Sequence, residues 1–297
     1  MSRTIGIVVS SRIVAGLMED HKLVGELSRF PSNPEDHEAL LEHHFESLCN
    51  LITDQVMALH PEGQIDAIGV ALPGIIRGGI VEDSPNLAQL KGGNIAEALS
   101  GKFQSKGVVA PVKTMNDADA VAAGLAVTQG RMDRLLRVWT IGNGIGFGRY
   151  PYAPGVWEGG HMVVTLDPKE TYCGCGGRGH LEGIMGYRAM RLRFLDMEPE
   201  EVFAAAKKGD TRCMEFVRLW HRGLGAATAT SIHLGGPGRF YFTGMNVRFL
   251  DLNLLKEYLW QMVKMSPLQS YSVEIVPDDA HTRVIGAAVS AEQAAGL

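Results

Sequence analysis

Two cysteines and two histidines lie close together in one glycine-rich stretch of the chain. Cys173 and Cys175 are separated by one residue, His180 follows five residues after Cys175, and His161 precedes Cys173 by twelve residues. Two thiolates and two imidazoles can complete the tetrahedral coordination of zinc, which takes sulfur and nitrogen ligands. The pattern predicts a zinc site formed by these four side chains. The alternative is a glycine-rich turn with free thiols, because short metal motifs also match by chance.

Asp117 is the second candidate for chemistry, since it follows Asn116 at the end of an apolar stretch over residues 108–114. Ligands of α/β sheets bind at the ends of strands. A carboxylate in that place can take the proton of an attacking hydroxyl group and orient the group for phosphoryl transfer. The alternative is that Asp117 only caps the helix expected after it. The residues alone leave both interpretations open.

A run of glycines at residues 142–148, with the sequence G-N-G-I-G-F-G, is the third candidate. Glycines allow backbone N–H groups to approach phosphate oxygens, because no Cβ atom stands in the way. A glycine run by itself is often a simple hairpin, so the residues alone leave open whether this one binds phosphate.

The composition restricts the classes of protein to which the chain can belong. Its 297 residues are 45% hydrophobic, which suffices for one large or two modest packed domains. Lys and Arg number 28 against 33 Asp and Glu, so the net charge is −5, and the chain has no basic run. This mild acidity argues against a protein that coats nucleic acid.

The cysteines and the N-terminus indicate the compartment. Two of the four cysteines are isolated and two are near neighbours, which does not indicate a disulfide framework, so we expect a reducing cytoplasm. The apolar run at residues 5–9 is short and is followed by Ser10, Ser11 and Arg12. We expect this run to form a strand rather than a signal peptide or a membrane span.

The candidate residues need a scaffold, and the hydrophobic pattern predicts one of strands and helices. Strands are expected at residues 4–9, 13–18, 22–27, 67–72, 108–114, 135–141, 240–242 and 272–276. A helix is expected from a cap at Asn33 and Pro34 through Leu59, and a capping box of Asn94 and Glu97 begins another. Mostly helical chain is expected at residues 118–127, 181–232, 252–263 and 280–293. The two sets of elements indicate two α/β lobes with a boundary near residue 118.

The motifs around the predicted zinc site resemble those of the ROK family of bacterial sugar kinases and sugar-responsive repressors. The resemblance rests on E-x-G-H at residues 158–161, C-x-C-G-x-x-G-x-x-E at residues 173–182, S-P-N-L at residues 84–87 and N-D at residues 116–117. In that family the zinc ligands are the histidine of E-x-G-H and three cysteines. The resemblance therefore implies a structural zinc ion held by the four side chains above, with His180 in place of the third cysteine.

The resemblance also implies a fold. ROK proteins have an actin-like, ribonuclease-H-like duplicated α/β fold, in which two lobes surround a central cleft that holds the substrate. Residues 1–118, joined by the last helix at residues 283–297, would form the N-terminal lobe. Residues 119–282 would form the C-terminal lobe with the zinc loop. The family is often dimeric, so a homodimer is expected.

Residue by residue, the resemblance assigns roles at the site. Asp117 matches the catalytic base that activates a sugar hydroxyl. The sugar-binding residues that it implies are Gly74, Asn86, Asn116, Asp117, Glu158, His161 and Glu182. The nucleotide-binding residues that it implies are Ser10, Ser11, Arg12, Gly142, Asn143, Gly144 and Gly244. Without their companions, Asn86 would be interpreted as a turn residue and Glu182 as a solvated helix residue.

The N-terminus departs from the family pattern. ROK kinases begin with a strand and D-x-G-G-T-K, whose aspartate and glycines hold the metal–phosphate end of ATP. Here Val8 replaces the aspartate, and Ser10 and Ser11 replace the glycines, although Arg12 could contact phosphate directly. Asn143 also replaces a threonine of the family's second glycine loop. The phosphate side is thus altered, whereas the sugar side is intact.

Two functions follow. The first is ATP-dependent phosphorylation of a hexose, glucokinase-like and requiring Mg²⁺, which Asp117 favours because a sensor needs no base. The second is a non-catalytic sugar-binding sensor or regulatory protein that has lost ATP turnover, which Val8 and Asn143 favour. A DNA-binding repressor is not expected, because those repressors carry a helix-turn-helix before the sugar domain and this chain begins at the first strand. If the phosphate site is merely impaired, Val8→Asp should raise activity.

Overall fold

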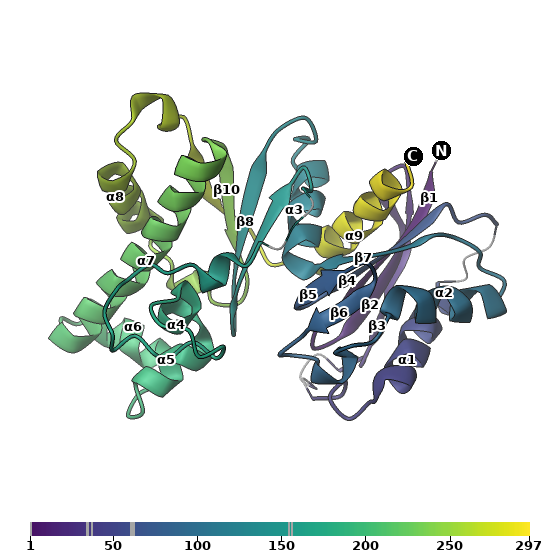
Figure 1. Ribbon diagram of the computed structural model, residues 1–297, viewed down its shortest axis with the longest axis horizontal. Helices are drawn as coiled ribbons and strands as arrows, with labels where there is room; N and C mark the ends of the chain where they lie inside the picture. The colour runs from purple at the N-terminus through teal and green to yellow at the C-terminus, as the bar shows by residue number, and fades with distance from the viewer. Residues whose placement is uncertain (1, 34–35, 37, 60–62, 154, 156) are drawn as a thin grey trace. The chain divides into compact units, whose positions relative to one another are not determined.

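A computed structural model describes residues 2–33, 36, 38–59, 63–153, 155 and 157–297 (Figure 1). The chain forms two compact units. The first comprises Met1–Arg134, Gly148–Val156 and Asp279–Leu297, and the second comprises Leu135–Phe147 and Trp157–Asp278. The predicted boundary at residue 118 falls inside the first unit, because helix α3 (Asp117–Thr128) packs against the C-terminal helix α9 (Ala280–Ala294).

The first unit is built on a five-stranded sheet in the order β3–β2–β1–β4–β7. Its strands are β1 (Arg3–Val9), β2 (Ile13–Glu19), β3 (Lys22–Phe30), β4 (Ala67–Leu72) and β7 (Val112–Asn116). The strands β1, β2 and β3 are antiparallel neighbours, whereas β4 runs parallel to β1 and β7 runs parallel to β4. A separate hairpin of β5 (Ile75–Arg77) and β6 (Ile80–Asp83) follows β4.

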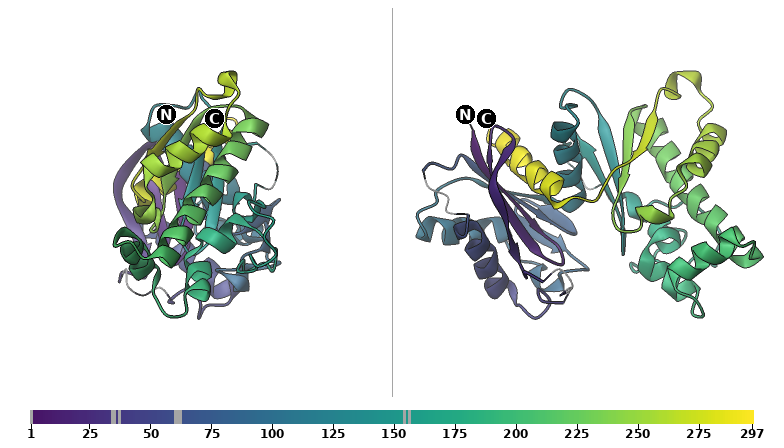
Figure 2. Two further views of the ribbon diagram at one scale, coloured as in Figure 1. Left: turned by 90° about the vertical axis from the view of Figure 1, so that its left-hand side faces the viewer. Right: turned by 180° about the vertical axis from the view of Figure 1, so that it is seen from behind.

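Helices cover both faces of this sheet (Figure 2). Successive residues of a strand point to opposite faces, so one strand can supply two cores. On β1, Ile5 and Ile7 join an apolar cluster with α1 (Phe45–Met57) and α2 (Ile95–Ser105), whereas Val8 joins a second cluster with α9 and α3. The sheet is therefore the middle of three layers.

Glycines let α9 lie close to the sheet and to α3. A Cβ atom added at Gly6 would lie 2.0 Å from the carbonyl oxygen of Val284, and one added at Gly286 would lie 1.7 Å from that of Ala120. Neither site has room for any side chain, so both positions need glycine. This packing fixes the start of α3, the segment that directly follows β7.

The second unit contains a four-stranded sheet in the order β11–β10–β8–β9. Its strands are β8 (Leu136–Ile141), β9 (Ile145–Tyr150), β10 (Arg239–Thr243) and β11 (Ser272–Ile275), and β10 is parallel to both β8 and β11. Its α-helices are α4 (Leu181–Met185), α5 (Tyr187–Arg193), α6 (Pro199–Lys207), α7 (Thr211–Gly235) and α8 (Leu252–Met262). Short 3₁₀ helices of the chain are η1 (Ala88–Leu90), η2 (Gly159–His161), η3 (Val247–Phe249) and η4 (Ser266–Leu268).

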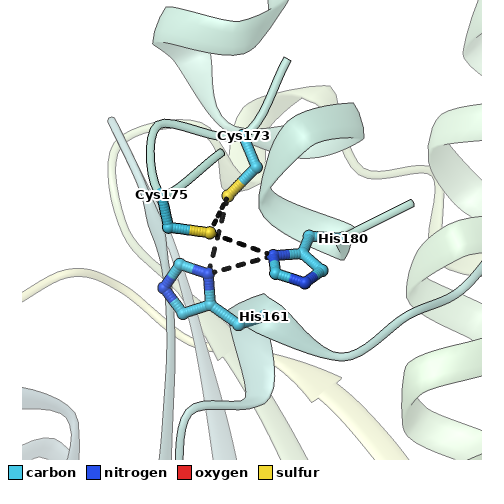
Figure 3. Close-up of side chains that lie close together, drawn as sticks. All are labelled: His161, Cys173, Cys175 and His180. Carbon is cyan, nitrogen blue, oxygen red and sulfur yellow. Dashed lines mark hydrogen bonds between the residues drawn. The ribbon is translucent and has the colours of Figure 1, made fainter. Parts of the chain in front are cut away.

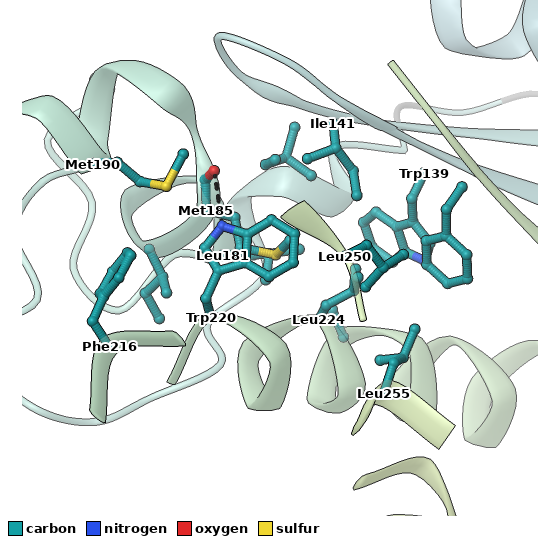
Figure 4. Packing of buried hydrophobic residues seen from close by; sticks show 14 of the residues in the cluster. Trp139, Ile141, Leu181, Met185, Met190, Phe216, Trp220, Leu224, Leu250 and Leu255 are labelled. Carbon is teal, nitrogen blue, oxygen red and sulfur yellow. Dashed lines mark hydrogen bonds between the residues drawn. The ribbon is translucent and has the colours of Figure 1, made fainter. Parts of the chain in front are cut away.

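One large apolar cluster fills the second unit between β8, β10 and the helices (Figure 4). Trp139 of β8 and Trp220 of α7 are fully buried in it. The indole N–H of Trp220 donates to the carbonyl oxygen of Met185, at 3.3 Å, so this buried donor is satisfied. The cluster joins the end of β8 to α4, the helix that begins directly after the predicted zinc ligand His180.

The helix expected from Asn33 begins only at Phe45. Leu41, which the spacing placed on its buried face, is 55% exposed, whereas Leu40 is buried in a turn. The predicted first helical residue, Pro34, lies outside the described residues. The three- and four-residue spacing therefore holds only from Phe45 onward, where Leu48, Cys49, Ile52 and Val56 of α1 are buried.

The other differences concern strands, and the strand expected at residues 108–114 is observed as β7 over Val112–Asn116. The hairpin of β5 and β6 was not predicted, and β9 occupies most of the glycine run at residues 142–148. Asn94 accepts a hydrogen bond from the backbone N–H of Glu97, so the predicted N-cap of α2 is confirmed. The Glu97 carboxylate accepts from Nδ2 of Asn94 and not from its backbone N–H, so the contact differs from the predicted capping box. Among the helices of the described segments, none combines the length and apolar character needed to cross a membrane.

Candidate functional site

The two cysteines and two histidines converge in the second unit (Figure 3). Their ligand atoms, the two Sγ atoms and the two Nδ1 atoms, all lie within 4.8 Å of one another. His161 ends η2, and His180 is the residue before α4. The structure therefore brings together the four residues that the spacing predicted as zinc ligands.

Three of the four ligand–ligand distances lie within about 0.3 Å of those around a tetrahedral zinc ion, and the two sulfur atoms are about 0.5 Å closer together. With Zn–S of about 2.3 Å and Zn–N of about 2.0 Å, tetrahedral ligands are separated by about 3.8 Å (S–S), 3.5 Å (S–N) and 3.3 Å (N–N). The corresponding distances are 3.3 Å between Cys173 and Cys175 and 3.4 Å between the two Nδ1 atoms. Cys173 lies 3.5 Å from Nδ1 of His161, and Cys175 lies 3.2 Å from Nδ1 of His180. The four side chains thus form a cradle of the right size and donor chemistry for zinc.

Burial shifts the pKa values of two groups in the cluster, Cys173 and His180. It raises the pKa of the Cys173 thiol to about 12, and it lowers the pKa of His180, with a further contribution from neighbouring His161. Both effects favour neutral groups. Because zinc binds thiolates, metal binding at this cluster would release thiol protons.

Backbone pairing and a buried ion pair position the loop that carries the cysteines. Val164 N–H donates to the carbonyl oxygen of Gly179, and Gly179 N–H donates to that of Glu170, both at 2.8 Å. The carboxylate of Glu170 accepts two hydrogen bonds from Arg193 of α5, and both side chains are largely buried. The guanidinium also lies 4.3 Å from the centre of the Tyr172 ring. The loop is therefore fastened at a point separate from the four ligands.

Glu182 links the cluster to the glycine turn. Its Oε2 accepts a hydrogen bond from the backbone N–H of Ile145 at 3.0 Å, and its Oε1 lies 3.8 Å from Sγ of Cys173. Glu182 is thus a half-buried, bonded side chain rather than a solvated helix residue. Glu158, also expected at the sugar site, lies 3.8 Å from Nε2 of His161.

The turn at residues 142–144 connects β8 and β9 as a hairpin, and its backbone N–H of Gly142 donates to the carbonyl oxygen of Gly144 at 3.0 Å. The second expected nucleotide segment lies against it. Gly244 has a positive φ of 101°, and a Cβ there would lie 2.6 Å from the carbonyl oxygen of Ile141. Gly142, Asn143, Gly144 and Gly244 are therefore neighbours in the second unit.

Sequence reasoning missed Asn246, which belongs to the same group. Its side chain is fully buried, and its Nδ2 donates to the carbonyl oxygen of Gly142 at 3.0 Å. The only signal in the sequence was a polar residue shortly after β10, in the segment Thr243-Gly244-Met245-Asn246. Such a residue is usually interpreted as part of a solvated loop.

In the first unit, Asn116 and Gly74 lie together at the ends of β7 and β4. Oδ1 of Asn116 accepts from the N–H of Ala118 at 2.8 Å, and its Nδ2 donates to the carbonyl oxygen of Gly74 at 2.9 Å. Asn116 is therefore the N-cap of α3, and half-buried Asp117 is the first residue of the helix. The alternative that Asp117 itself caps α3 is wrong, because its neighbour fills that role.

The S-P-N-L segment lies in the same unit. Ser84 is buried and its hydroxyl donates to the carbonyl oxygen of Pro73 at 2.8 Å. Asn86, the expected sugar ligand, is exposed in the turn between Ser84 and buried Leu87. Ser84 thus fastens this turn to the end of β4.

The first turn, at residues 10–12, uses its polar groups within the chain. The Arg12 guanidinium donates to the carbonyl oxygens of Pro31, at 2.7 and 3.0 Å, and of Ser32, at 3.1 Å. Val8 is only 4% exposed and packs in the apolar cluster beneath α9. Ser10 and Ser11 are half-buried and exposed, respectively. The arginine that sequence reasoning offered to phosphate is thus occupied by the protein's own backbone.

Comparison with known proteins places this arrangement in a family. A sequence model of the ROK family matches residues 13–293. The chain is 30% identical over 187 residues to a glucokinase of Pyrobaculum calidifontis, an alignment that covers 58% of this chain and only 60% of that enzyme. It is 28% identical over 219 residues to an N-acetylmannosamine kinase of Haemophilus influenzae, covering 70% of this chain and 68% of that enzyme.

A solved structure shares the fold. The ROK hexokinase from Thermus thermophilus superposes with a TM-score of 0.80 at 22% identity and covers 99% of both chains. At this identity the likeness concerns the fold alone. Together with the two mixed α/β sheets, it confirms the predicted actin-like α/β fold.

Proposed function

Because the chain belongs to the ROK family, we propose that it transfers the terminal phosphoryl group of ATP to a hydroxyl group of a hexose. Asp117 is the general base that accepts the proton of the attacking hydroxyl. The similarity to a glucokinase and to an N-acetylmannosamine kinase supports a hexose or an N-acetylhexosamine as the substrate class. The proposal includes a homodimer in the cytoplasm.

The observation that carries this proposal is the position of Asn116 and Asp117 at the start of α3, directly after β7. Asn116 is the N-cap of α3 and accepts the hydrogen bond from Ala118 N–H, and Asp117, directly after it, is the first residue of the helix. A carboxylate at the N-terminal end of a helix is stabilised in its charged form, which is the form a base needs. Asn116 holds the turn through Gly74, one of the residues that we assign to sugar binding.

The other residues divide by role. We assign Gly74, Asn86, Asn116, Glu158, His161 and Glu182 to the sugar, and Gly142, Asn143, Gly144 and Gly244 to the nucleotide. His161, Cys173, Cys175 and His180 hold a structural zinc ion, which supplies fixed bonds that keep the loop folded. Nδ1 of His161 belongs to the cluster, so its Nε2 carries the proton and can donate to a ligand hydroxyl. Mg²⁺ accompanies ATP, as phosphoryl transfer requires neutralised charge.

A coupled assay with Mg-ATP and a panel of hexoses and N-acetylhexosamines tests the catalytic proposal. We expect Asp117→Asn to lower kcat by about 10³-fold and to leave hexose affinity within a few-fold, since the amide keeps the shape but cannot accept the proton. Asp119→Asn, two residues further along the same helix, is the matched control. Turnover that survives Asp117→Asn would refute the role of this base.

Metal analysis tests the zinc assignment. We expect one zinc per chain, lost in Cys173→Ser and retained in Cys213→Ala, because Cys213 is a buried thiol of the core outside the cluster. Purified protein without stoichiometric zinc would refute it.

A second function, sugar binding without turnover, is favoured by the first turn. Val8 is buried among apolar side chains and Arg12 is engaged by Pro31 and Ser32, so this turn offers neither a carboxylate to Mg²⁺ nor an unoccupied guanidinium fork to phosphate. Calorimetry separates the two functions. Hexose binding with no ATP hydrolysis and no Mg-ATP affinity would support the sensor and exclude the kinase.

A further inference from the structure

Asn246 is a fully buried polar side chain that lies outside every motif of the sequence. It follows the sharp bend at Gly244, where φ is 101°, directly after β10. Among the described residues its Oδ1 has no hydrogen-bond partner. Burial of an unpaired amide oxygen costs free energy, so an apolar side chain at this position would give a more stable core. The asparagine is therefore explained only if the amide nitrogen, Nδ2, has a function.

The other end of the amide is bound to the glycine turn. Nδ2 of Asn246 donates to the carbonyl oxygen of Gly142 at 3.0 Å, and its backbone N–H donates to the carbonyl oxygen of Ile141 at 2.9 Å. One residue therefore holds the last residue of β8 and the first residue of the turn. Since Gly142 has no side chain of its own, its conformation depends on such contacts.

The turn has two further fastenings, and both come from the neighbourhood of the zinc loop. Tyr187 N–H at the start of α5 donates to the same carbonyl oxygen of Gly142 at 3.1 Å, and Glu182 accepts from Ile145 N–H. Of the three contacts, the one from Asn246 is made by a side chain that is neither a zinc neighbour nor a proposed sugar ligand. It can therefore be removed without touching either site.

We propose that Asn246 is a positioning residue for the nucleotide: it holds the turn at residues 142–144 in the conformation in which the backbone N–H groups of Asn143 and Gly144 bind phosphate. This inference rests on the proposed function of that turn. A free glycine-rich turn samples many conformations and loses that freedom on binding. The amide of Asn246 removes part of this entropy in advance, so its effect falls on nucleotide affinity and not on the reacting groups.

The test compares Asn246→Ala and Asn246→Ser with a control at the same strand end. Serine keeps a small polar side chain that is too short to reach Gly142. The control is Thr243→Val, because Thr243 is equally buried and its Oγ1 has no hydrogen-bond partner among the described residues. Each full-length protein is measured for Mg-ATP affinity and hexose affinity by calorimetry, and for amide hydrogen exchange at residues 141–145.

We expect both Asn246 variants to bind Mg-ATP about fivefold to tenfold more weakly, a loss of about 1 to 1.4 kcal/mol. Exchange at residues 141–145 should be faster, and hexose affinity should stay within twofold. Thr243→Val should match the unaltered protein in all three measurements.

Three outcomes would overturn the inference. Asn246 variants that bind Mg-ATP normally show that the turn needs no such fastening. An equal loss in Thr243→Val assigns the effect to general packing of the strand end. Unaltered protein that binds no nucleotide overturns the proposed function first and the inference with it, so the two failures are distinguished by the unaltered protein alone.

Discussion

The turns at residues 10–12 and 142–144 share one backbone pattern and differ in everything else. Each joins the first two strands of its sheet, β1 to β2 and β8 to β9. In the first, Ser10 N–H donates to the carbonyl oxygen of Arg12 at 2.9 Å, and in the second, Gly142 N–H donates to that of Gly144 at 3.0 Å. The duplicated fold thus presents two equivalent hairpins.

The difference lies in what surrounds them. The residues of the first turn all have side chains, and the turn follows the buried strand that contains Val8. The guanidinium of Arg12 donates hydrogen bonds to the carbonyl oxygens of Pro31 and Ser32. The second turn has glycine at two of three positions and is fastened from outside by Glu182 and Asn246. Successive backbone N–H groups of a turn form an anion-binding concavity when the turn is held in one conformation. We therefore expect the second turn to bind nucleotide and the first to be structural.

The largest expected effect comes from Val8→Asp. The sequence suggested that this change could restore activity, whereas the burial of Val8 predicts a carboxylate forced into an apolar cluster. We expect a loss of about 3 kcal/mol in the free energy of unfolding, measured with urea. Val8→Asn is the control, because asparagine has nearly the shape of aspartate and no charge. The difference in the free energy of unfolding between the two variants should decrease at acid pH, where the carboxylate is protonated. A stable Val8→Asp protein with raised turnover would break the comparison.

Gly142→Ala tests the second turn directly. An added Cβ meets nothing nearer than the carbonyl oxygen of Gly144 at 3.8 Å, so the fold has room for it. Because it narrows the approach to the backbone N–H groups, we expect Mg-ATP affinity to fall about tenfold, or about 1.4 kcal/mol, with an unchanged melting temperature. Ser11→Ala at the first turn should leave both unchanged. A loss of Mg-ATP affinity in Ser11→Ala but not in Gly142→Ala would mean that the first turn binds the phosphates.

Arg12→Ala sharpens the contrast from the structural side. Loss of the guanidinium leaves the carbonyl oxygens of Pro31 and Ser32 without their donor, which should cost about 1 kcal/mol of stability. Mg-ATP affinity should not change. Arg12→Lys keeps the charge and loses the fork, so it should behave nearly as the alanine variant. An affinity loss without a stability loss would identify Arg12 as a phosphate ligand.

The last prediction concerns the pH dependence of stability in the second unit. Nδ1–H of His221 donates to the carbonyl oxygen of Val217, and its Nε2 accepts from Asp251 N–H, so the imidazole is neutral. Burial lowers the pKa of His221 below 6.5. As the pH falls, His221 therefore takes up a proton in the unfolded chain before it does so in the folded one. Its contribution to the free energy of unfolding is full above pH 6.5 and declines below it, by at most about 1.4 kcal/mol per pH unit.

Urea unfolding between pH 5 and pH 8 measures this decline. His221→Gln keeps polar atoms but does not titrate, so its curve should be flatter below pH 6.5. If the free energy of unfolding of the unaltered protein and of His221→Gln fell equally with pH, His221 would not be the group that causes the decline.

Local chemistry made much of the scaffold predictable. Strand β4 was expected at its observed bounds, and α2 and α3 begin where cap residues stand in the sequence. The four zinc-type ligands are close in sequence, so their convergence needs only short-range turns. The start of α1 was not predictable, because Leu40 and Leu41 are adjacent and only the packed core decides which is buried.

The sequence by itself determined which chemical groups the protein has: a Cys/His quartet, an Asn–Asp pair after a strand, one glycine turn and one turn without glycines. Spacing, caps and periodicity encode these locally. Only the tertiary structure decided that Asn116 rather than Asp117 caps α3. It also decided that Arg12 donates hydrogen bonds to the carbonyl oxygens of Pro31 and Ser32, and that Asn246 donates one to that of Gly142. These partners are up to 104 residues apart in the chain. Packing of whole elements brings them together, and no local pattern records it.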